Sequence, residues 1–434
     1  MDSGCTGGRS NSAMSTPFPT PPLARPQLGP APDARRQLPP RLRAILSLRD
    51  LEPAARRVLP RPIFGYLQGG VEDNVTLQAN TAAFRQWMFR TQVLVNVSAR
   101  QQAVQLMGQT YQAPFGIAPM GLCALFAYDG DVAMARAAEA AGIPHVLSGA
   151  SLTRMERVAE AAPTCGWFQA YIPGEPAHIE GLVDRVEKAG FRTLVVTVDT
   201  ATLANRENNV RVGFSTPLRP SLRLAMDGLV RPRWLAGTLA RTLLAHGMPH
   251  FENAGAGRGV PIISRSVVRQ FGLRDHLSWE HLALVRRLWR GKLVIKGLVS
   301  ADDVRRAEQA GADGVILSNH GGRQLDGTLP PLLALPEAAR AKGAMALMLD
   351  SGVRRGTDVL KALSLGADHV FVGRPMAYAA AIGGQAGVAH AVRLLKDEIH
   401  RDMALLGVER LEQLGPERLA RVHLPSDSFQ GDEP

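Results

Sequence analysis

A repeated rhythm constrains the fold of this chain more than any other feature. From Pro114 onward, a short apolar run is followed by a polar turn and then by an alanine-rich stretch of helix length. Apolar runs of this kind are typical of buried parallel strands. Eight strands that alternate with helices predict an α/β fold, a (β/α)₈ TIM barrel. The expected strands are Phe115–Pro119, His145–Ser148, Trp167–Ile172, Thr193–Val198, Leu293–Ile295, Gly314–Leu317, Met345–Leu349 and His369–Val372.

The stretches between these strands favour helices. We expect helices at Asp131–Ala141, Ile179–Ala189, Asp302–Ala310 and Thr357–Leu365, and a further one at Leu51–Val58 in an extension before the barrel. A doubly wound open sheet is the main alternative, but no GxGxxG opens a first helix. One long insertion separates strands four and five, and connections of that length are usually functional.

The two ends of the chain differ in composition from the rest. Residues 1–45 are rich in Pro, Ser, Gly and Arg and predict a disordered tail; Met14 is an alternative start. Residues 46–424 form the expected catalytic domain, with an insertion at 215–275, and residues 425–434 form a second tail. No apolar run is long enough for a transmembrane helix, and no secretory pattern opens the chain.

Three cysteines, Cys5, Cys123 and Cys165, are widely spaced and form no CxxC, so we expect neither a disulfide scaffold nor a metal site. A cytoplasmic location follows from this pattern. The net charge of +11 is concentrated in two segments. Residues 1–45 hold six arginines against two aspartates, and residues 215–258 hold six arginines against two acidic residues. With aromatics at only 5% and no recognised motif, we do not expect nucleic acid binding.

Polar residues collect where the predicted strands end, which is the catalytic face of a barrel. His320 and Arg323 follow strand six, where two glycines turn the backbone sharply. An imidazole accepts a proton near neutral pH, and a guanidinium offers a planar fork to a carboxylate. A structural role is the usual one for a single histidine, but the position at a strand end beside Arg323 favours chemistry on a small acid.

The turns after strands seven and eight predict an anion cradle. Glycines expose backbone N–H groups there, a helix starts at Thr357, and Arg354 and Arg374 add charge. Across the barrel mouth, Ser148, Gln169 and Thr197 can hydrogen-bond a planar heterocycle, with Lys296 beside it. A phosphate at one side and a polar platform across the mouth indicate flavin mononucleotide, FMN.

At this point the residues resemble a known family, the FMN-dependent α-hydroxy-acid dehydrogenases and oxidases. The resemblance covers about Leu51 to Leu424, and its most specific motif is Ser-Asn-His-Gly-Gly-Arg-Gln-Leu-Asp at 318–326. Asp-Ser-Gly-Val-Arg-Arg-Gly-Thr-Asp-Val at 350–359 and Gly-Arg-Pro at 373–375 support it. So do Phe-Gln-Ala-Tyr at 168–171, Thr-Val-Asp-Thr at 197–200 and Val-Ile-Lys-Gly at 294–297.

The resemblance implies a role for each matched residue. His320 is the base that takes the substrate proton, and Asp199 orients its imidazole. The implied substrate contacts are Tyr66, Arg206 and Arg323 to the carboxylate and Tyr171 to the hydroxyl. Lys296 stabilises the reduced flavin, and the flavin ring and ribityl chain contact Ala118, Ser148, Gln169 and Thr197. Ser318 also belongs to the cofactor site, and the ribityl and phosphate groups are held by Asp350, Gly352, Arg354, Gly373 and Arg374.

The implied reaction is FMN-dependent oxidation of an L-2-hydroxy acid, lactate or mandelate-like, to the 2-oxo acid. Electrons then pass to a quinone or another acceptor; the alternative is a soluble oxidase that uses O₂ and releases H₂O₂. The family also implies a homotetramer. Ala201, Asn209 and Val212 depart from residues common in the family, and Ala150 replaces a bulky tryptophan of glycolate oxidase. The smaller side chain favours lactate or larger acids over glycolate.

The segment 218–258 resembles the insertion of membrane-associated family members. It combines several arginines with apolar pairs at Trp234-Leu235, Leu239-Ala240 and Leu243-Leu244, spaced for one helix face. We expect either peripheral contact with the inner face of the cell membrane or a lid over the active site.

Two further functions stay open from the residues alone. A lysine at a strand end, Lys296, suits a Schiff-base aldolase, although an aldolase needs neither His320 nor Arg323. A flavin-binding protein without catalysis is the other, and an intact set of His320, Asp199, Arg323 and Lys296 argues against it.

Overall fold

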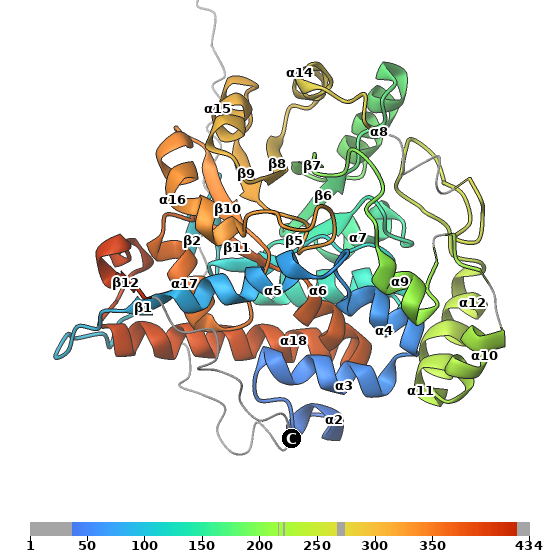
Figure 1. Cartoon of the computed structure of the whole chain (residues 1–434), viewed down its shortest axis with the longest axis horizontal. Helices are drawn as coiled ribbons and strands as arrows, with labels where there is room; N and C mark the ends of the chain where they lie inside the picture. The colour runs from blue at the N-terminus through green and yellow to red at the C-terminus, as the bar shows by residue number, and fades with distance from the viewer. Residues whose placement is uncertain (1–36, 216, 220–221, 267–273, 423–434) are drawn as a thin grey trace, which may run out of the picture.

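The computed structural model describes residues 37–422 except 216, 220–221 and 267–273 (Figure 1). Residues 1–36 of the predicted N-terminal tail and all of the predicted tail 425–434 lie outside this range. Residues 37–45 are described, and they contain the short helix α2, Pro40–Arg43, with Leu42 and Ile45 buried. Two apolar side chains at the end of the predicted tail therefore pack into the core.

Eight parallel strands close into a barrel, which confirms the predicted fold. Their order around the barrel is β10-β11-β4-β5-β6-β7-β8-β9, so chain neighbours pair throughout. The bounds are β4 Phe115–Ile117, β5 His145–Ser148, β6 Gly166–Ala170, β7 Thr193–Thr197, β8 Lys292–Leu298, β9 Gly314–Leu317, β10 Ala346–Leu349 and β11 His369–Val372.

The barrel interior is an apolar layer with a polar layer above it. Trp167, Val195 and Val294 belong to one buried cluster that fills the barrel, together with Val146, Ile316, Met348 and Phe371. Side chains two residues apart along a strand face the same side. The residues two positions further on are Ser148, Gln169, Thr197, Lys296, Ser318, Asp350 and Gly373. The apolar layer therefore forms a floor, and most of the predicted cofactor residues stand on it.

Helices cover the outside of the barrel and separate its strands in sequence (Figure 1). They are α6 Gly130–Ala141, α7 Met155–Ala161, α8 Pro176–Lys188, α14 Trp279–Leu288, α15 Ala301–Gln309, α16 Pro331–Ala341, α17 Gly356–Ser364 and α18 Arg374–Leu406. The last of these is interrupted at Gly384, whose φ of 55° lies outside the helical range. No helix in the described residues is both long enough and apolar enough to cross a membrane.

An N-terminal extension packs beside the barrel. After α2 it contains α3 Leu51–Val58, α4 Arg61–Gln68 and α5 Val75–Ala82. The helix predicted at Leu51–Val58 is confirmed. The segment around Tyr66 is helical, and the glycines after it end α4. Two small sheets complete the chain: β1 Trp87–Phe89 pairs with β12 Leu419–Arg421, and β2 Val104–Leu106 pairs with β3 Gln109–Tyr111.

The long insertion after β7 folds into its own short helices. These are α9 Glu207–Val212, α10 Leu222–Leu229, α11 Pro232–Trp234, the π-helix η4 Leu235–Ala240 and α12 Arg241–His246. Trp234 belongs to the apolar pairs that were grouped on one helix face. It is buried, and its indole N–H donates to the Leu125 carbonyl at 2.7 Å. That hydrogen bond ties the insertion to the barrel.

Two buried histidines make the fold sensitive to acid. His145 and His369 begin β5 and β11, and burial lowers the pKa of each from 6.5 to about 3. The unfolded chain therefore binds protons below pH 6.5 that the folded chain does not bind. Stability is full above that pH and is lost as the pH falls, by about 1.4 kcal/mol per pH unit for each histidine.

The change His369→Leu removes one of these two acid-sensitive groups. Between pH 7.5 and pH 5, we expect the free energy of unfolding of this variant to fall by about 2 kcal/mol less than that of the native chain. Urea unfolding followed by circular dichroism at both pH values measures this. The control is His178→Leu, because His178 is exposed on α8. An equal pH dependence in the native chain and in His369→Leu would contradict the assignment.

Candidate active site

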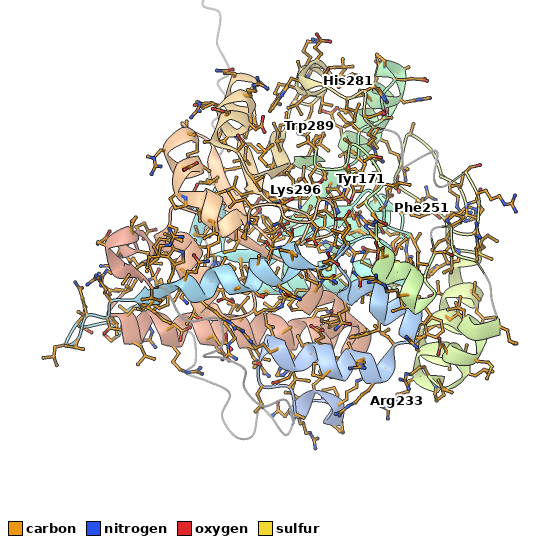
Figure 2. The ribbon with its side chains drawn as sticks, in the orientation of Figure 1. Tyr171, Arg233, Phe251, His281, Trp289 and Lys296 are labelled. Carbon is orange, nitrogen blue, oxygen red and sulfur yellow. The ribbon has the colours of Figure 1, made fainter. Side chains whose placement is uncertain are left out.

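A cavity of about 590 Å³ opens at the carboxyl ends of the barrel strands. Figure 2 shows Tyr171 and Lys296 near the middle of the molecule, with Phe251 toward the insertion. Fourteen of the predicted site residues line this cavity: Tyr66, Ala118, Gln169, Tyr171, Thr197, Arg206, Lys296, His320, Arg323, Asp350, Gly352, Arg354, Gly373 and Arg374. The other three, Ser148, Asp199 and Ser318, each hydrogen-bond a residue that does line it.

His320 is held in an uncommon backbone conformation just after β9. Its φ is 58°, and Gly321 and Gly322 follow with φ of 66° and 73°. A side chain at Gly322 would collide with the backbone of Leu77, so this turn requires glycine there. The His320 N–H donates to Ser318 Oγ at 3.1 Å. The turn carries the imidazole from the strand end into the cavity wall.

Asp199 holds the His320 imidazole in place through a hydrogen bond. Its Oδ1 lies 2.9 Å from His320 Nδ1, which leaves Nε2 as the ring nitrogen available to a bound molecule. Burial lowers the pKa of His320, and the attraction of Asp199 only partly opposes this. Burial alone raises the pKa of Asp199, but His320 and then Lys296 bring it below its usual value. At neutral pH this is a neutral imidazole beside an ionised carboxylate.

Lys296 is a buried cation with two partners. Its Nζ donates to Ser318 Oγ at 2.6 Å and lies 2.9 Å from Asp350 Oδ2. A buried ammonium needs such a counter-ion, because an unpaired charge in the interior is costly. The pair places one positive charge on the polar layer, next to Thr197 in the β7–β8 register.

Arg323 uses one arm for structure and leaves the other for a ligand. Its Nη1 donates to the carbonyls of Tyr66, at 2.8 Å, and Gly69, while its guanidinium lies 4.8 Å from the Tyr66 ring centroid. Its Nη2 is buried with no partner among the described residues. Burial, together with Arg206, lowers the pKa of Arg323 to about 9, so it stays charged at pH 7. Arg323 was predicted to bind a carboxylate with both guanidinium nitrogens, but within the described residues only Nη2 remains available to a ligand.

Arg206 braces the loop that carries Arg323. Its Nε donates to the Arg323 carbonyl at 3.1 Å, and its Nη2 donates to Gln324 Oε1 at 2.8 Å. The family departures nearby have a packing role. Val212 on α9 fills the space left by Gly65 on α4, where any side chain would collide with it. This close approach brings α9 against α4 and sets the position of Arg206 at the start of α9.

Several cavity residues were not predicted from the sequence. Arg274 is buried in the cavity wall, with its guanidinium 4.8 Å from the ring centroid of Tyr171. Phe214 packs against Tyr66 with ring centroids 4.5 Å apart. Phe251, Met120 and Ser351 also line the cavity. Ser351 lies in the motif at 350–359 but was given no role there. The others lie in no recognisable motif, and Arg274 comes from the far end of the insertion, so no local pattern singles them out.

One side of the cavity is built to hold a polar, planar molecule and an anion. Gln169 Nε2 and Thr197 Oγ1 are buried without a partner among the described residues. Gln169 Oε1 accepts from Ser148 Oγ at 3.1 Å, which fixes the amide so that its NH₂ is left over. At the rim, Gly352 has a φ of 93°, and Arg354 and Arg374 lie beside it at the starts of α17 and α18.

Comparisons with known proteins agree with this geometry. The family model described as FMN-dependent dehydrogenase matches residues 55–421. The chain is 36% identical over 375 residues to the (S)-mandelate dehydrogenase of Pseudomonas putida, covering 86% of this chain and 94% of that protein. It is 38% identical over 379 residues to an L-lactate dehydrogenase of Xanthomonas euvesicatoria pv. vesicatoria (strain 85-10), covering 86% and 96%.

A solved structure gives the same result for the fold. The crystal structure of the monotopic membrane protein (S)-mandelate dehydrogenase superposes with a TM-score of 0.80 at 37% identity, covering 87% of this chain and 100% of that chain. The family match spans the whole barrel and both of its signature turns. The chain belongs to the family of FMN-dependent dehydrogenases and is a flavoenzyme whose cofactor is FMN.

Proposed function

We propose that this enzyme oxidises an L-2-hydroxy acid to the 2-oxo acid and passes the electrons to a quinone or another acceptor. The observation that carries this proposal is the shared position of two groups on one turn. His320 offers Nε2, and Arg323 offers a partnerless buried Nη2. A neutral base beside a single free cationic arm suits a molecule that carries a hydroxyl next to a carboxylate.

The cavity fits FMN on its remaining side. Gln169 Nε2 and Thr197 Oγ1, which have no partner among the described residues, would donate to acceptor atoms of the isoalloxazine ring. Asp350 and Gly352 suit the ribityl chain, and Arg354, Arg374 and the N–H groups at Gly373 suit the phosphate. Arg374 is held for this by hydrogen bonds from Nε to the Leu67 carbonyl and from Nη2 to the Gly321 carbonyl, both at 2.9 Å.

In the proposed oxidation, each of these residues has a separate role. Arg323 and Tyr66 hold the substrate carboxylate, and Arg206 keeps their loop in place. The phenol of Tyr171 has a pKa of about 12, raised by burial and then by Asp199, so it remains a hydrogen-bond donor to the substrate oxygen. His320 takes a substrate proton at Nε2, and the ionised Asp199 stabilises the resulting imidazolium. When bound, FMN supplies the two-electron acceptor that the oxidation requires.

Lys296 has a separate task in this proposal. It stands on the same layer as Thr197 and Gln169, and its Nζ lies 2.9 Å from Asp350 Oδ2. A fixed cation at this position stabilises negative charge that develops above it and needs no reorganisation to do so. The aldolase alternative would require a neutral amine at Lys296, whereas the observed ion pair stabilises the ammonium form.

Anaerobic bleaching of the bound flavin tests the function directly. We expect the purified yellow enzyme to lose its visible absorbance on addition of an L-2-hydroxy acid and to keep it on addition of the D-enantiomer. A protein that stays colourless with FMN supplied, or a flavin that no 2-hydroxy acid bleaches, would overturn the proposal. Peroxide release in air then separates a dehydrogenase from an oxidase, and we expect it to be slow compared with reduction of a quinone.

The rate should depend on pH through His320. Because burial lowers the pKa of His320 below 6.5, the neutral form that accepts a proton predominates at pH 7. We expect kcat/KM to be constant above pH 6.5 and to fall tenfold per pH unit once the pH drops below the pKa of His320. Initial rates between pH 4.5 and 8 measure this profile. An acidic limb centred well above pH 6.5 would contradict a buried neutral base.

We also propose peripheral contact of the insertion with an anionic membrane. On α10, Leu222, Met226 and Leu229 are 79%, 60% and 67% exposed and are spaced four and three residues apart. This spacing puts them on one helix face. No described residue of α10, α11, η4 or α12 lines the active-site cavity, so these helices are placed for an outward contact. Ser215 and Phe251, outside these helices, do line it.

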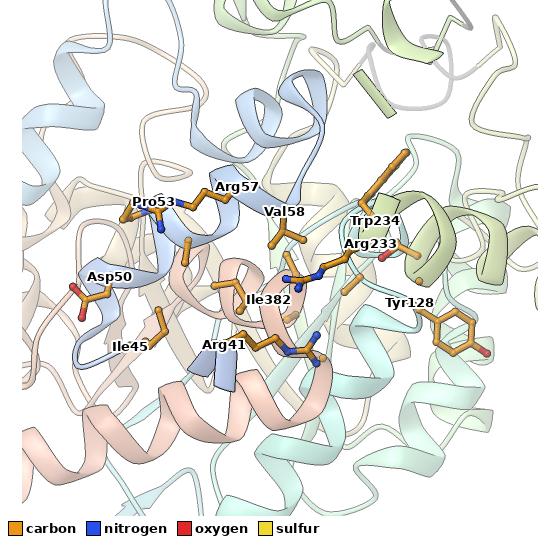
Figure 3. Close-up of a pocket in the computed structure, with 18 of the residues that line it drawn as sticks. Arg41, Ile45, Asp50, Pro53, Arg57, Val58, Tyr128, Arg233, Trp234 and Ile382 are labelled. Atoms are coloured by element: carbon orange, nitrogen blue, oxygen red, sulfur yellow. The ribbon is translucent and has the colours of Figure 1, made fainter. Parts of the chain in front are cut away.

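Positive charge gathers where the insertion meets the N-terminal extension. A second cavity, of about 720 Å³, separates the insertion from the N-terminal extension and is lined by Arg41, Arg57, Arg233 and Arg241. Figure 3 shows Arg41 and Arg233 reaching into it from different elements. Within the described residues none of the four forms an ion pair, and Arg241 stacks on Tyr128 at 3.9 Å. Anionic lipid headgroups suit such a rim.

Vesicle sedimentation tests the membrane contact. We expect the enzyme to pellet with vesicles that contain anionic lipid at low salt, and to be released by high salt or by the double change Met226→Glu and Leu229→Glu. The control is Leu405→Glu on α18, because Leu405 is also 67% exposed but lies outside the insertion. Equal pelleting of the native chain and the double variant would end the proposal.

Family membership further supports a homo-oligomer, with a tetramer as our proposal. The described loop at Val93–Val95 exposes three consecutive apolar side chains, which suits a contact between copies. Light scattering of the purified enzyme measures its mass, and a monomer at micromolar concentration would contradict this proposal.

A further inference from the structure

The turn that carries His320 and Arg323 adopts a backbone conformation that needs support from outside. Three consecutive residues, His320, Gly321 and Gly322, have φ of 58°, 66° and 73°. For a residue with a side chain, such as His320, this conformation is unfavourable and persists only where the surrounding contacts enforce it. The positions of the imidazole and of the Arg323 guanidinium therefore depend on what holds the turn.

Helix α5 of the N-terminal extension holds the loop that contains this turn. At the far end of the loop, Asp326 Oδ1 accepts from the Thr76 N–H at 2.7 Å, and Oδ2 accepts from the Val75 N–H at 3.1 Å. Within the turn, Gly322 lies so close to Leu77 that a side chain at Gly322 would collide with the Leu77 backbone. The loop therefore lies directly against α5.

At the near end of the loop, two buried amides bind each other. Asn80 Nδ2 donates to Asn319 Oδ1 at 2.9 Å, and Asn319 Nδ2 donates to Asn80 Oδ1 at 2.7 Å. The two side chains are 2% and 5% exposed. Asn319 Oδ1 also accepts from the Gly322 N–H at 3.2 Å. Asn319 and Gly322, which flank His320 and Gly321, are therefore connected to α5 through Asn80.

Asn80 also contacts the second signature turn. Its backbone carbonyl lies so close to Gly352 that a side chain at Gly352 would collide with it. Gly352 has a φ of 93° and lines the cavity where the ribityl chain is proposed to lie. One residue outside the barrel therefore touches both the turn of the proposed base and the turn of the proposed cofactor site.

We propose that Asn80 is a positioning residue for the oxidation, and that it acts through Asn319 to keep His320 and Arg323 in place over the flavin. This inference rests on the proposed 2-hydroxy-acid oxidation. Asn80 itself does not line the cavity. Each amide offers the donor and the acceptor that the other needs, so the pair is satisfied without water. Without Asn80, the Asn319 amide is free to rotate and the turn can relax, which moves His320 Nε2 away from the substrate.

Anaerobic flavin reduction in Asn80→Ala tests this role. We use whichever of L-lactate and L-mandelate reduces the native enzyme faster. We expect the variant to keep FMN and to reduce it about 10- to 100-fold more slowly at saturating substrate, because a misplacement of about 1 Å has an effect of this size. The control is Gln78→Ala, at an exposed residue of the same helix. A rate in Asn80→Ala within threefold of the native rate would refute the inference, whereas a native enzyme that neither acid reduces would count against the proposed function.

A double variant shows whether Asn80 acts through Asn319. We expect Asn319→Ala to be slow as well, and the variant with both changes to be no slower than Asn319→Ala alone, because the two residues share one interaction. Effects that simply multiply in the double variant would contradict a shared role.

Product binding gives a readout without turnover. Arg323 lies on the same turn, so the dissociation constant of the corresponding 2-oxo acid, pyruvate or phenylglyoxylate, should rise about tenfold in Asn80→Ala and stay unchanged in Gln78→Ala. The shift of the flavin spectrum on binding measures it. Binding of native strength in Asn80→Ala would mean that the turn keeps its position without Asn80.

Asn80→Asp adds a test that does not depend on the folding of Asn80→Ala. A protonated aspartate has one donor and one acceptor, as the amide has, whereas an ionised aspartate has acceptors only. We expect the reduction rate of this variant, divided by the native rate at the same pH, to fall about tenfold as the pH rises from 5.5 to 9.5. The visible spectrum at each pH reports bound flavin. A ratio that stays constant over this range would rule out the proposed role of the amide pair.

Discussion

Replacing His320 with glutamine is expected to leave FMN bound and to slow flavin reduction by about 10²- to 10⁴-fold, the usual contribution of a general base. Glutamine is similar in size and keeps a hydrogen bond to Asp199, but it cannot accept the proton that Nε2 takes. His320 Nδ1 lies 2.9 Å from Asp199 Oδ1, so the change also leaves that carboxylate without an imidazolium to stabilise.

Stopped-flow reduction under anaerobic conditions separates this effect from loss of cofactor. The visible spectrum of the variant reports bound flavin, and the amplitude and rate of bleaching report the chemical step. His178→Gln provides the control, because that histidine is exposed on α8 and pairs with Glu175. If His320→Gln reduced its flavin at the native rate, the base would have to be another residue.

Arg323→Lys is expected to lower kcat/KM by about 100-fold, through weaker substrate binding as well as slower chemistry. Two effects combine in this variant. The substrate carboxylate loses its hydrogen bond to the buried Nη2, and a hydrogen bond to a charged group is worth about 1.5–3 kcal/mol. The carbonyls of Tyr66 and Gly69 also lose donors, because an ammonium cannot reach two carbonyls and a ligand with the same geometry.

Saturation kinetics and inhibitor binding distinguish these two effects. We expect KM and the dissociation constant of a non-reactive carboxylate inhibitor to rise together, while the flavin spectrum stays native. Arg287→Lys is the matched control on the exposed end of α14. A kcat/KM within threefold of the native value would remove Arg323 from the carboxylate site and leave it a role in holding α4 only.

Much of the barrel follows from local pattern. Each strand of the barrel is short and apolar, so its position can be predicted from chain order alone, as β9 and β11 show with matching bounds. The polar layer follows as well, because a period of two places Gln169 above Trp167 and Lys296 above Val294. Burial of the lower residue on the barrel floor makes the upper residue face the mouth.

Local composition was least informative where distant segments come into contact. Trp234 was grouped with apolar pairs spaced for one helix face, yet its indole donates to a carbonyl 109 residues earlier in the chain. Residues 37–45 have the composition of a tail, yet Leu42 packs against Gly383 of α18 and is buried. In both cases a single long-range contact outweighs the local composition.

The sequence by itself determined the barrel, the order of its strands and the identity of most residues at its mouth. These are encoded in apolar alternation and in short motifs whose physical effect is local. Only the tertiary structure decided how those residues share their bonds. In the folded chain, Arg323 Nη1 donates to the Tyr66 carbonyl of α4, and Nη2 has no partner among the described residues. Lys296 pairs with Asp350, and Arg274 is buried beside Tyr171. These contacts depend on which donors and acceptors come within hydrogen-bond distance when the barrel closes. The order of residues along the chain does not give the distances between such atoms in space.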